Sequence, residues 1–442
     1  MKKVNLTEGK VFKVIFALAI PIMGGSLLQF AYNMVDMLWV GGLGSDAVAS
    51  IGSASFLIGL GYSINALVVI GTGIKVAQAI GKNDDVETSQ YINTGLLING
   101  IIGVAYALFI IFGSKYFIKF LNLGNINVQR DVHSYLMISA PMLLFAFYNS
   151  LYTRIFGSFG NNKEAFKISL VGIILNIVLD PIFIYVFKFG VLGAGIATLI
   201  ANMIMFLIFI VKCKKLFKFD LKSGMDIDKI NEIVRLGFPT AFQRILFTIV
   251  NIILARIIAK FGSDAIAAQK IGLQIESINY MVIGGLNGAL ASFTGQNFGA
   301  EKYKRIDDGY KVALNIGIIY TIITAIILII APQPIIRLFV SEESTVLIAS
   351  GYLQIIAISQ IFSAIEMVTT GLFIGIGIPK ISANVIILYT VLRIPMAIIF
   401  IKYLDVNGIW WSISISSILK GITLYLIYRL KVRKRYENVR KY

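Results

Sequence analysis

Four polar residues interrupt apolar segments in the first half of the chain, where their side chains could bind an ion. Asp36 lies in the run Tyr-Asn-Met-Val-Asp-Met-Leu-Trp at 32–39. Asn176 and Asp180 are four residues apart and so share one face of a helix, and Thr198 lies in a later apolar segment. Carboxylates with amide and hydroxyl oxygens suit a small hard cation, whereas a buried carboxylate without a cation holds a proton. These residue types therefore predict binding of Na+ or H+.

Each acid alone also has a plainer interpretation. Asp36 lies one turn before Gly41-Gly42 and could reach the headgroup region of a membrane, while Asp180-Pro181 could mark a break in a helix. A charge at bilayer depth costs about 2.5 to 3.5 kcal/mol on insertion scales, so such residues usually mark ion or substrate paths. Ion binding is the stronger interpretation for the pair, because both acids belong to the same half of the chain at similar depth.

The segments that carry these residues have the composition of membrane helices. Hydrophobic residues make up 57% of the 442 residues, charged residues only 14%, and the mean hydropathy is +0.82. A spanning helix needs roughly 20 apolar residues, and the chain has about twelve such segments, six in each half. The sequence predicts an all-α polytopic membrane protein with two six-helix bundles related by a pseudo-twofold axis along the membrane normal.

The two halves of the chain are copies of one another. Gly44 to Ala49 recurs, with one change, as Gly262 to Ala267, at an offset of 262 − 44 = 218 residues. The repeat predicts three regions: an N-terminal lobe at 1–211, a lysine-rich cytoplasmic linker at 212–229, and a C-terminal lobe with a basic tail at 230–442.

The acids of the first half have no counterparts in the second. Leu254 falls opposite Asp36, and Ile394 or Ala397 falls near the place opposite Asp180. We therefore assign a cation site to the N-terminal lobe only.

The second half instead carries charges of both signs inside its apolar segments: Arg244, Arg256, Glu276, Glu366 and Arg393. A salt bridge from Glu276 to Arg244 or Arg256, holding the lobe together, fits this pattern as well as a substrate contact does. Glu366 could face a central cavity and attract cationic substrates.

The net charge of +17 and the isoelectric point near 9.7 arise from basic residues that concentrate in alternate loops. By the positive-inside rule this pattern places both termini in the cytoplasm and the protein in the cell membrane, and it does not indicate binding to nucleic acid. His133 and Cys213, the single histidine and cysteine, cannot form a metal cluster, an internal disulfide or an intramembrane active site. No phosphate-binding glycine loop is present. We expect neither an enzyme nor a cofactor.

Several distinct motifs are spread along the chain between about residue 10 and about residue 430. They are Pro21 followed by Tyr32-Asn33-Met34-Val35-Asp36 and Gly41-Gly42-Leu43-Gly44, then Arg154 to Asn161, Gln274 to Ser277, and Gly295 to Ala300. Each motif alone is weak. Together they resemble the multidrug and toxic compound extrusion (MATE) transporters, in particular the prokaryotic branch with its cation site in the N-terminal lobe.

The resemblance implies a V-shaped pair of six-helix lobes that exports organic compounds in exchange for Na+ or H+. In that branch an acid of the first helix, an Asn and an Asp of the fifth and a Thr of the sixth form the ion site. The matching residues here are Asp36, Asn176, Asp180 and Thr198.

Further residues are expected to support or gate this site. The resemblance implies bending of the first helix at Pro21, and it makes Tyr135 and Asn149 of the fourth helix supporting partners of the ion ligands. Tyr32 and Asn33 lie on the helical face of Asp36.

We therefore expect a monomeric antiporter in the lipid bilayer, with small organic, cationic or amphipathic substrates and with Na+ or H+ as the coupling ion. The alternative is a flippase for a lipid-linked oligosaccharide or cell-wall precursor. Basic residues in its cavity would meet a pyrophosphate group, and Arg244, Arg256 and Arg393 keep that alternative open.

Overall fold

The computed structural model describes residues 5–214 and 226–433, and no strand occurs among them. Two π-helical turns, Ile182–Val186 and Tyr428–Val432, extend α5 and α14, and a 3-10 turn, Ala259–Phe261, extends α7. The α-helices are α1 (Val11–Gly41), α2 (Ser45–Gly81), α3 (Asp85–Leu121), α4 (Ile126–Ser158), α5 (Asn162–Pro181), α6 (Gly190–Cys213), α7 (Ile227–Ile258), α8 (Ser263–Gly299), α9 (Tyr303–Ile330), α10 (Pro332–Ile336), α11 (Glu343–Gly375), α12 (Pro379–Val391), α13 (Arg393–Leu404) and α14 (Asn407–Ile427).

Eleven helical stretches within the described residues are long and apolar enough to cross a membrane. The further span predicted from the sequence corresponds to α8, which has 37 residues but is less apolar because it carries Gln269, Glu276 and Asn279. These three side chains are buried, so they face the protein interior. The prediction of an all-α polytopic membrane protein is confirmed. Much of the predicted linker and tail, at 215–225 and 434–442, lies outside the described residues.

The helices form two compact units. Unit 1 is built on Gly24–Ala241, and unit 2 on Leu6–Met23 together with Phe242–Tyr442. This division differs from the lobes predicted at 1–211 and 230–442, because the first part of α1 packs within unit 2 and the first part of α7 packs within unit 1.

The boundaries between the units fall at equivalent places in the repeat. One lies inside α1 between Met23 and Gly24, and the other lies inside α7 between Ala241 and Phe242. The two places are 218 residues apart, which is the offset found in the sequence.

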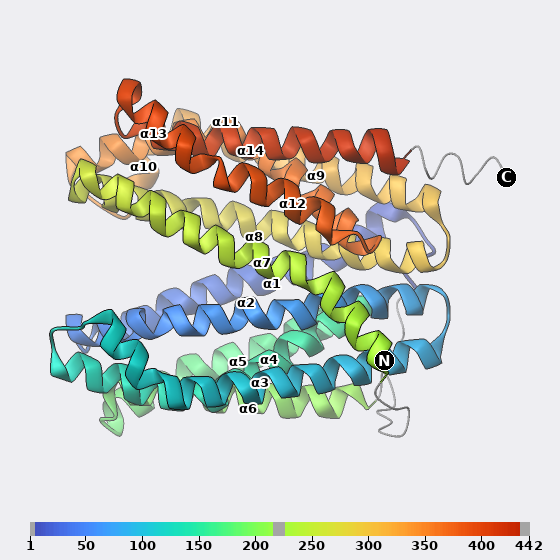
Figure 1. Ribbon diagram of the computed structural model, residues 1–442, viewed down its shortest axis with the longest axis horizontal. Coiled ribbons are helices and arrows are strands. Elements are labelled where there is room, and N and C mark those ends of the chain that lie inside the picture. The colour runs from blue at the N-terminus through green and yellow to red at the C-terminus, as the bar shows by residue number, and fades with distance from the viewer. Residues whose placement is uncertain (1–4, 215–225, 434–442) are drawn as a thin grey trace. The chain divides into compact units, whose positions relative to one another are not determined.

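The long helices of each unit run side by side (Figure 1). Within each unit one helix contacts most of the others. In unit 1, α4 contacts α2, α3, α5 and α6; in unit 2, α11 contacts α8, α9, α12 and α14. Helices α4 and α11 both have 33 residues, and α2 and α8 both have 37. The repeat thus preserves the lengths of these two helix pairs, at an offset of 218 for α2 and α8 and of 217 for α4 and α11.

A glycine before α2 and its copy before α8 explain the most similar stretch of the two halves. Gly44 has φ 104° and Gly262 has φ 94°, backbone conformations that residues with a Cβ rarely adopt. Asp46 and Asp264 follow in the first helical turn, where a negative charge interacts favourably with the helix dipole. The repeated Gly-Ser-Asp therefore forms the same turn into a long helix in both units.

Small residues allow the first part of α7 to pack closely on α2. A Cβ on Gly237 would lie 1.7 Å from the carbonyl oxygen of Leu67, and a Cβ on Gly71 would lie 2.1 Å from that of Ile233. In unit 2 the first part of α1 approaches α8 similarly, because a Cβ on Gly285 would lie 2.4 Å from Cγ of Met23. Close backbone approach of this kind is the usual basis of helix association in membranes.

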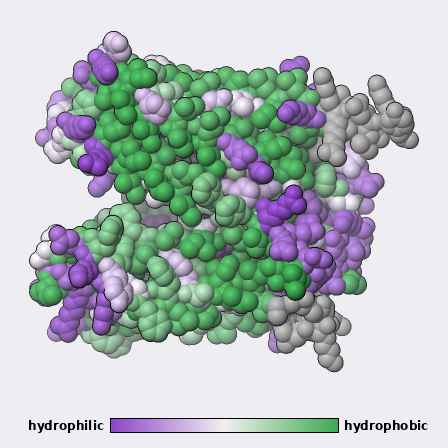
Figure 2. All heavy atoms as spheres, in the orientation of Figure 1, coloured by the Kyte–Doolittle hydropathy of each residue, from purple (hydrophilic) through white to green (hydrophobic). Residues whose placement is uncertain are grey.

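The surface agrees with a membrane location. Figure 2 shows hydrophobic residues covering the flanks of the helices on the face drawn, with hydrophilic residues gathered toward their ends. Exposed apolar side chains such as Phe112 on α3 and Ile330 on α9, 73% and 77% exposed, would cost free energy in water and are stable in lipid.

Candidate cation site

Two acids of unit 1 lie close together. Asp180, near the end of α5, has no exposed surface, and Asp36 of α1 is half-buried. Their carboxyl groups are close enough to interact directly. Two carboxylates at this separation repel each other, so they cannot both remain ionised unless a proton or a cation lies with them.

Only one of the two carboxylate oxygens of Asp180 accepts a hydrogen bond. Nδ2 of Asn176, one helical turn earlier, donates to Oδ2 of Asp180 at 2.7 Å. Oδ1 of Asp180 is buried and accepts no hydrogen bond. An unpartnered buried carboxylate oxygen is costly, and a bound cation or proton would remove that cost. The donor set therefore fits either Na+ or H+.

Thr198 and Tyr32 lie beside the two acids. The Tyr32 side chain lies near that of Thr198, and it interacts electrostatically with both Asp36 and Asp180. Oγ1 of Thr198 donates to the carbonyl of Ala194 at 2.9 Å, so its lone pairs remain available as acceptors. The structure thus brings α1, α5 and α6 together at one polar position.

Tyr135 and Asn149 both lie on α4 but at different distances from the acids. Tyr135 is buried and interacts electrostatically with Asp36 and Asp180. Asn149 is buried one layer away: its Nδ2 donates to the carbonyl of Asn202 at 2.9 Å, and Asn202 donates to the carbonyl of Thr198. Asn149 therefore braces α6 rather than contacting the acids.

Asn33, which shares a helical face with Asp36, does not contact the acids, and Pro21, the predicted bending point, lies nearer the beginning of α1. Asn33 is exposed, and its Oδ1 accepts a hydrogen bond from Nε2 of Gln29 at 3.1 Å. Pro21 belongs to the part of α1 that packs within unit 2, and α1 is continuous through it. The structure therefore gives Asn33 no contact with the acids.

In unit 2 the partners of Glu276 are tyrosines. The Tyr280 hydroxyl donates to Oε1 at 2.6 Å and the Tyr352 hydroxyl donates to Oε2 at 2.8 Å. Arg244 and Arg256 are exposed, and Glu276 forms no ion pair with any residue in the described part of the chain. The salt bridge predicted for Glu276 is therefore not formed, and two tyrosine hydroxyls donate hydrogen bonds to its carboxylate instead.

Glu366 is neutralised by a residue that the sequence did not single out. Nζ of Lys420 on α14 lies 3.0 Å from Oε2 of Glu366, and the two side chains are only 5% and 12% exposed. Arg393 is also buried, and its Nε donates to Oγ of Ser416 at 2.9 Å. The sequence did contain one indication of this role. Lys420 places a charge inside the apolar α14, four residues after Ser416 and so on the same helical face.

The described residues contain no group of three or more His, Cys, Asp or Glu side chains that could hold a metal ion. Cys213 is buried as a free thiol, and Nδ1 of His133 lies 3.1 Å from Oγ of Ser114. The candidate site offers carboxylate, amide and hydroxyl oxygens, which suit a small hard cation or a proton.

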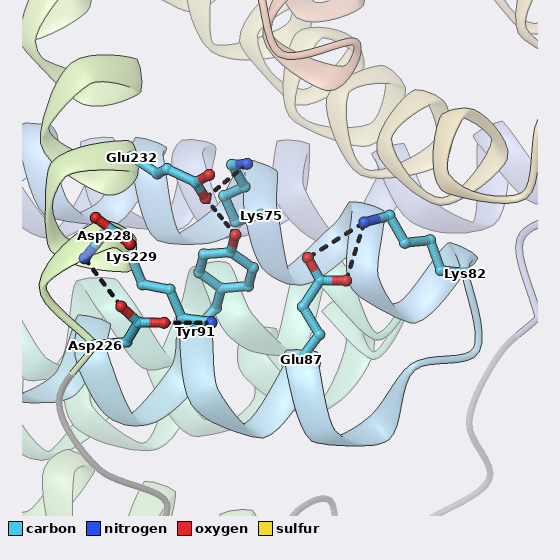
Figure 3. Close-up of polar contacts among 8 residues, drawn as sticks. All are labelled: Lys75, Lys82, Glu87, Tyr91, Asp226, Asp228, Lys229 and Glu232. Carbon is cyan, nitrogen blue, oxygen red and sulfur yellow. Dashed lines mark hydrogen bonds and ion pairs between the residues drawn. The ribbon is translucent and has the colours of Figure 1, made fainter.

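A second polar cluster, the α7-start cluster, attaches the beginning of α7 to α2 and α3 within unit 1 (Figure 3). Nζ of Lys75 lies 2.8 Å from Oε2 of Glu232, and the Tyr91 hydroxyl donates to the same oxygen. Lys229 lies over the Tyr91 ring and pairs with Asp226 at 2.9 Å. The hydrogen bond from Lys229 lowers the pKa of the Asp226 carboxyl below its ordinary value.

A double-mutant cycle measures how much the ion pair of this cluster contributes to stability. We expect Lys75→Ala and Glu232→Ala to show a coupling energy of about 1 kcal/mol or less, because the Glu232 side chain is 45% exposed and solvent screens it. Thermal unfolding in detergent measures it, and the coupling should shrink as salt is raised. The Lys82–Glu87 pair, at 3.0 Å, does not involve α7 and serves as the comparison for an ion pair of similar exposure. Additive single-variant effects at low salt would contradict a stabilising pair.

The fold and the acid pair define a class of protein: a duplicated helical membrane protein with a pair of neighbouring acids in one copy only. The family model described as MatE matches residues 21–182 and 239–399, which is more than half of the chain and includes both copies. The chain belongs to the MatE family.

Relatives match along nearly the whole chain. The probable multidrug resistance protein YpnP of Bacillus subtilis is 26% identical over 441 residues, covering 97% of both chains. The probable multidrug resistance protein NorM of Thermotoga maritima is 24% identical over 440 residues, covering 95% of this chain and 92% of its own. The multidrug export protein MepA of Staphylococcus saprophyticus is 26% identical over 439 residues, covering 95% and 94%.

Solved structures share the fold. A crystal structure of MATE in complex with MaL6 superimposes with a TM-score of 0.92 at 25% identity, covering all of both chains. A MOP superfamily transporter from Pyrococcus furiosus, described as having a binding pocket of reverse polarity, superimposes with a TM-score of 0.91 at 24% identity and covers 98% of both chains.

Proposed function

We propose that the protein is an antiporter of the cell membrane that exports small organic compounds, cationic or amphipathic in character, in exchange for Na+ or H+. The observation that carries the proposal is the contact of Asp36 with the fully buried Asp180, whose Oδ1 has no hydrogen-bond donor. Such a pair requires a cation or a proton. The multidrug-related names of the relatives support an organic substrate.

The acid pair can couple ion binding to the position of α1. When a cation or proton lies between Asp36 and Asp180, the two groups attract it jointly and α1 stays close to α5 and α6. When the ion leaves, two negative charges face each other in a poorly solvated place, and their repulsion favours separation of α1 from α5. Ion binding thus selects between two arrangements of α1, which is what alternating access requires.

Other residues of the chain prepare this coupling. Asn176 holds Asp180 in one rotamer through its 2.7 Å hydrogen bond, and the Asn149–Asn202 contact fixes α6 behind Thr198. Pro21 has no backbone N–H to donate, so α1 can bend there at reduced cost when the ion is released.

The proposed orientation has both termini in the cytoplasm, as the loop charges predict. In this orientation the α7-start cluster lies at the cytoplasmic side, and the exposed turns at Gly44 and Gly262 lie at the outer side. Export then takes up substrate from the cytoplasm and returns an ion inward.

Purified protein in phosphatidylethanolamine and phosphatidylglycerol vesicles tests the proposal directly. A Na+ gradient and a pH gradient are imposed one at a time while uptake of a fluorescent organic cation is followed. We expect one gradient to drive accumulation and its ionophore to abolish it. Equal dye movement with and without both gradients would overturn ion coupling, and dye movement no faster than in protein-free vesicles would overturn the substrate class.

A further inference from the structure

The two units share a pair of tyrosines at the same places in the same helices. Tyr62 of α2 and Tyr280 of α8 are related by the offset of 218, and Tyr135 of α4 and Tyr352 of α11 by the offset of 217 that relates the bounds of those helices. In unit 1 the Tyr135 side chain interacts electrostatically with that of Tyr62. In unit 2 both tyrosines donate to one carboxylate.

The carboxylates near this tyrosine pair come from different helices in the two units. In unit 1 they are Asp36 of α1 and Asp180 of α5. The equivalent positions in unit 2 are Leu254 and Ala397, both fully buried in an apolar cluster. Unit 2 supplies Glu276 from α8 instead.

Unit 2 also supplies cations, which unit 1 lacks at this place. Arg393 stands at the position equivalent to Asn176, at the offset of 217 that relates the starts of α5 and α12. Lys420 pairs with Glu366 at 3.0 Å and interacts electrostatically with Arg393 and Glu276. All four charged side chains are at most 12% exposed.

The charges of the two clusters therefore add up differently. In unit 2 two carboxylates, Glu276 and Glu366, are balanced by the ammonium of Lys420 and the guanidinium of Arg393. In unit 1, within the described residues, neither Asp36 nor Asp180 interacts with a lysine or an arginine. Because buried charge must be compensated, unit 1 needs an outside cation and unit 2 does not.

We propose that Lys420 and Arg393 are tethered cations that do in unit 2 what the coupling ion does in unit 1, so that unit 2 is closed to Na+ and H+ and holds a latent monovalent-cation site at Glu366. The inference rests on the proposed function of the Asp36–Asp180 pair. It makes Lys420 a determinant of how many ions the protein binds. Removing the ammonium leaves the Glu366 carboxylate buried without a partner, and a free cation or proton then takes its place.

The test is cation uptake by the purified full-length chain. Radioactive sodium binding at alkaline pH and proton uptake after a step to mildly acidic pH are each measured in detergent. We expect the parent to take up about one cation per chain more than Asp36→Asn, because protons taken up by surface groups cancel in this difference. We expect Lys420→Met to take up about one cation more than the parent, and addition of Glu366→Gln to Lys420→Met to restore the parental number. Lys402→Met, at an exposed lysine of α13, is the control and should match the parent.

The outcomes separate the inference from the proposed function. If Lys420→Met takes up no more cation than the parent while Asp36→Asn loses uptake, the tethered-cation proposal is overturned and the unit 1 site stands. If the parent takes up no cation, or Asp36→Asn takes up as much as the parent, both fail.

A second variant, Glu276→Gln, tests the same proposal even if Lys420→Met does not fold. This change keeps the shape of the side chain and one acceptor oxygen, and the second tyrosine hydroxyl can rotate to accept from the new amide N–H. It should leave cation uptake at the parental number. Loss of a cation in Glu276→Gln would show that unit 2 itself binds an exchangeable ion, and would overturn the proposal.

Discussion

Asp180→Asn is expected to abolish export driven by an ion gradient while leaving the protein folded. Asparagine has the shape of aspartate and keeps an oxygen to accept the 2.7 Å hydrogen bond from Asn176, so the local packing survives. It removes one of the two negative charges that hold the ion. Losing one contact to a charged group costs about 1.5 to 3 kcal/mol, which weakens ion affinity roughly tenfold to hundredfold.

The measurement is ion-driven dye export in vesicles and dye accumulation in cells expressing each variant. Asp46→Asn is the matched control. Asp46 is an exposed carboxylate of unit 1 that also accepts a side-chain amide, from Asn125 at 2.8 Å, and its neutralisation should leave export unchanged. Export by Asp180→Asn at the parental rate and the parental ion concentration would refute the assignment of the ion site.

Part of this site follows from the sequence alone. Helical periodicity predicts that Asn176 and Asp180 share a face, and the structure has them hydrogen-bonded. The approach of Asp36 to Asp180 could not be derived in that way, because it depends on the rotation and height of α1 relative to α5. Packing between helices sets those quantities, and no local pattern records them. Only the resemblance to a known family predicted that these two acids would meet.

Lys420 was missed for a different physical reason. Lys420 lies near the middle of the apolar span Asn407–Val432, so its charge was a usable signal. The sequence alone, however, does not name the partner of a buried lysine. Its pairing with Glu366 depends on α11 and α14 lying side by side. The helical class and the duplication, by contrast, were predictable, because hydropathy and an exact repeat such as Gly-Ser-Asp need no knowledge of tertiary contacts.

Gly237→Ala is expected to be among the most destabilising single-methyl additions in unit 1. The new Cβ would lie 1.7 Å from the carbonyl oxygen of Leu67, far inside van der Waals contact. That oxygen belongs to the backbone, so a change of rotamer cannot relieve the clash, and α7 must move away from α2. Overpacking of this kind typically costs about 1 to 3 kcal/mol, and more where backbone must shift.

Thermal unfolding in detergent, followed by tryptophan fluorescence and helical circular dichroism, measures the loss. Gly59→Ala on α2 is the control: no atom lies within 4 Å of its added Cβ, so the change should be neutral or stabilise by up to about 1 kcal/mol. An unfolding midpoint for Gly237→Ala equal to that of the parent would mean that α2 and α7 do not approach as closely as the structure has them.

The boundaries inside α1 and α7 bear on how such a protein arose. Each half of the repeat gives the beginning of its first helix to the unit formed mainly by the other half. Two separate chains, each carrying one half, would therefore have folded as a domain-swapped homodimer, with both partners exchanging a helix beginning. Gene fusion would turn that exchange into the intramolecular arrangement of α1 and α7. Once fused, the two copies were free to diverge, so that one could retain an exchangeable ion and the other could acquire its own permanent counter-charges.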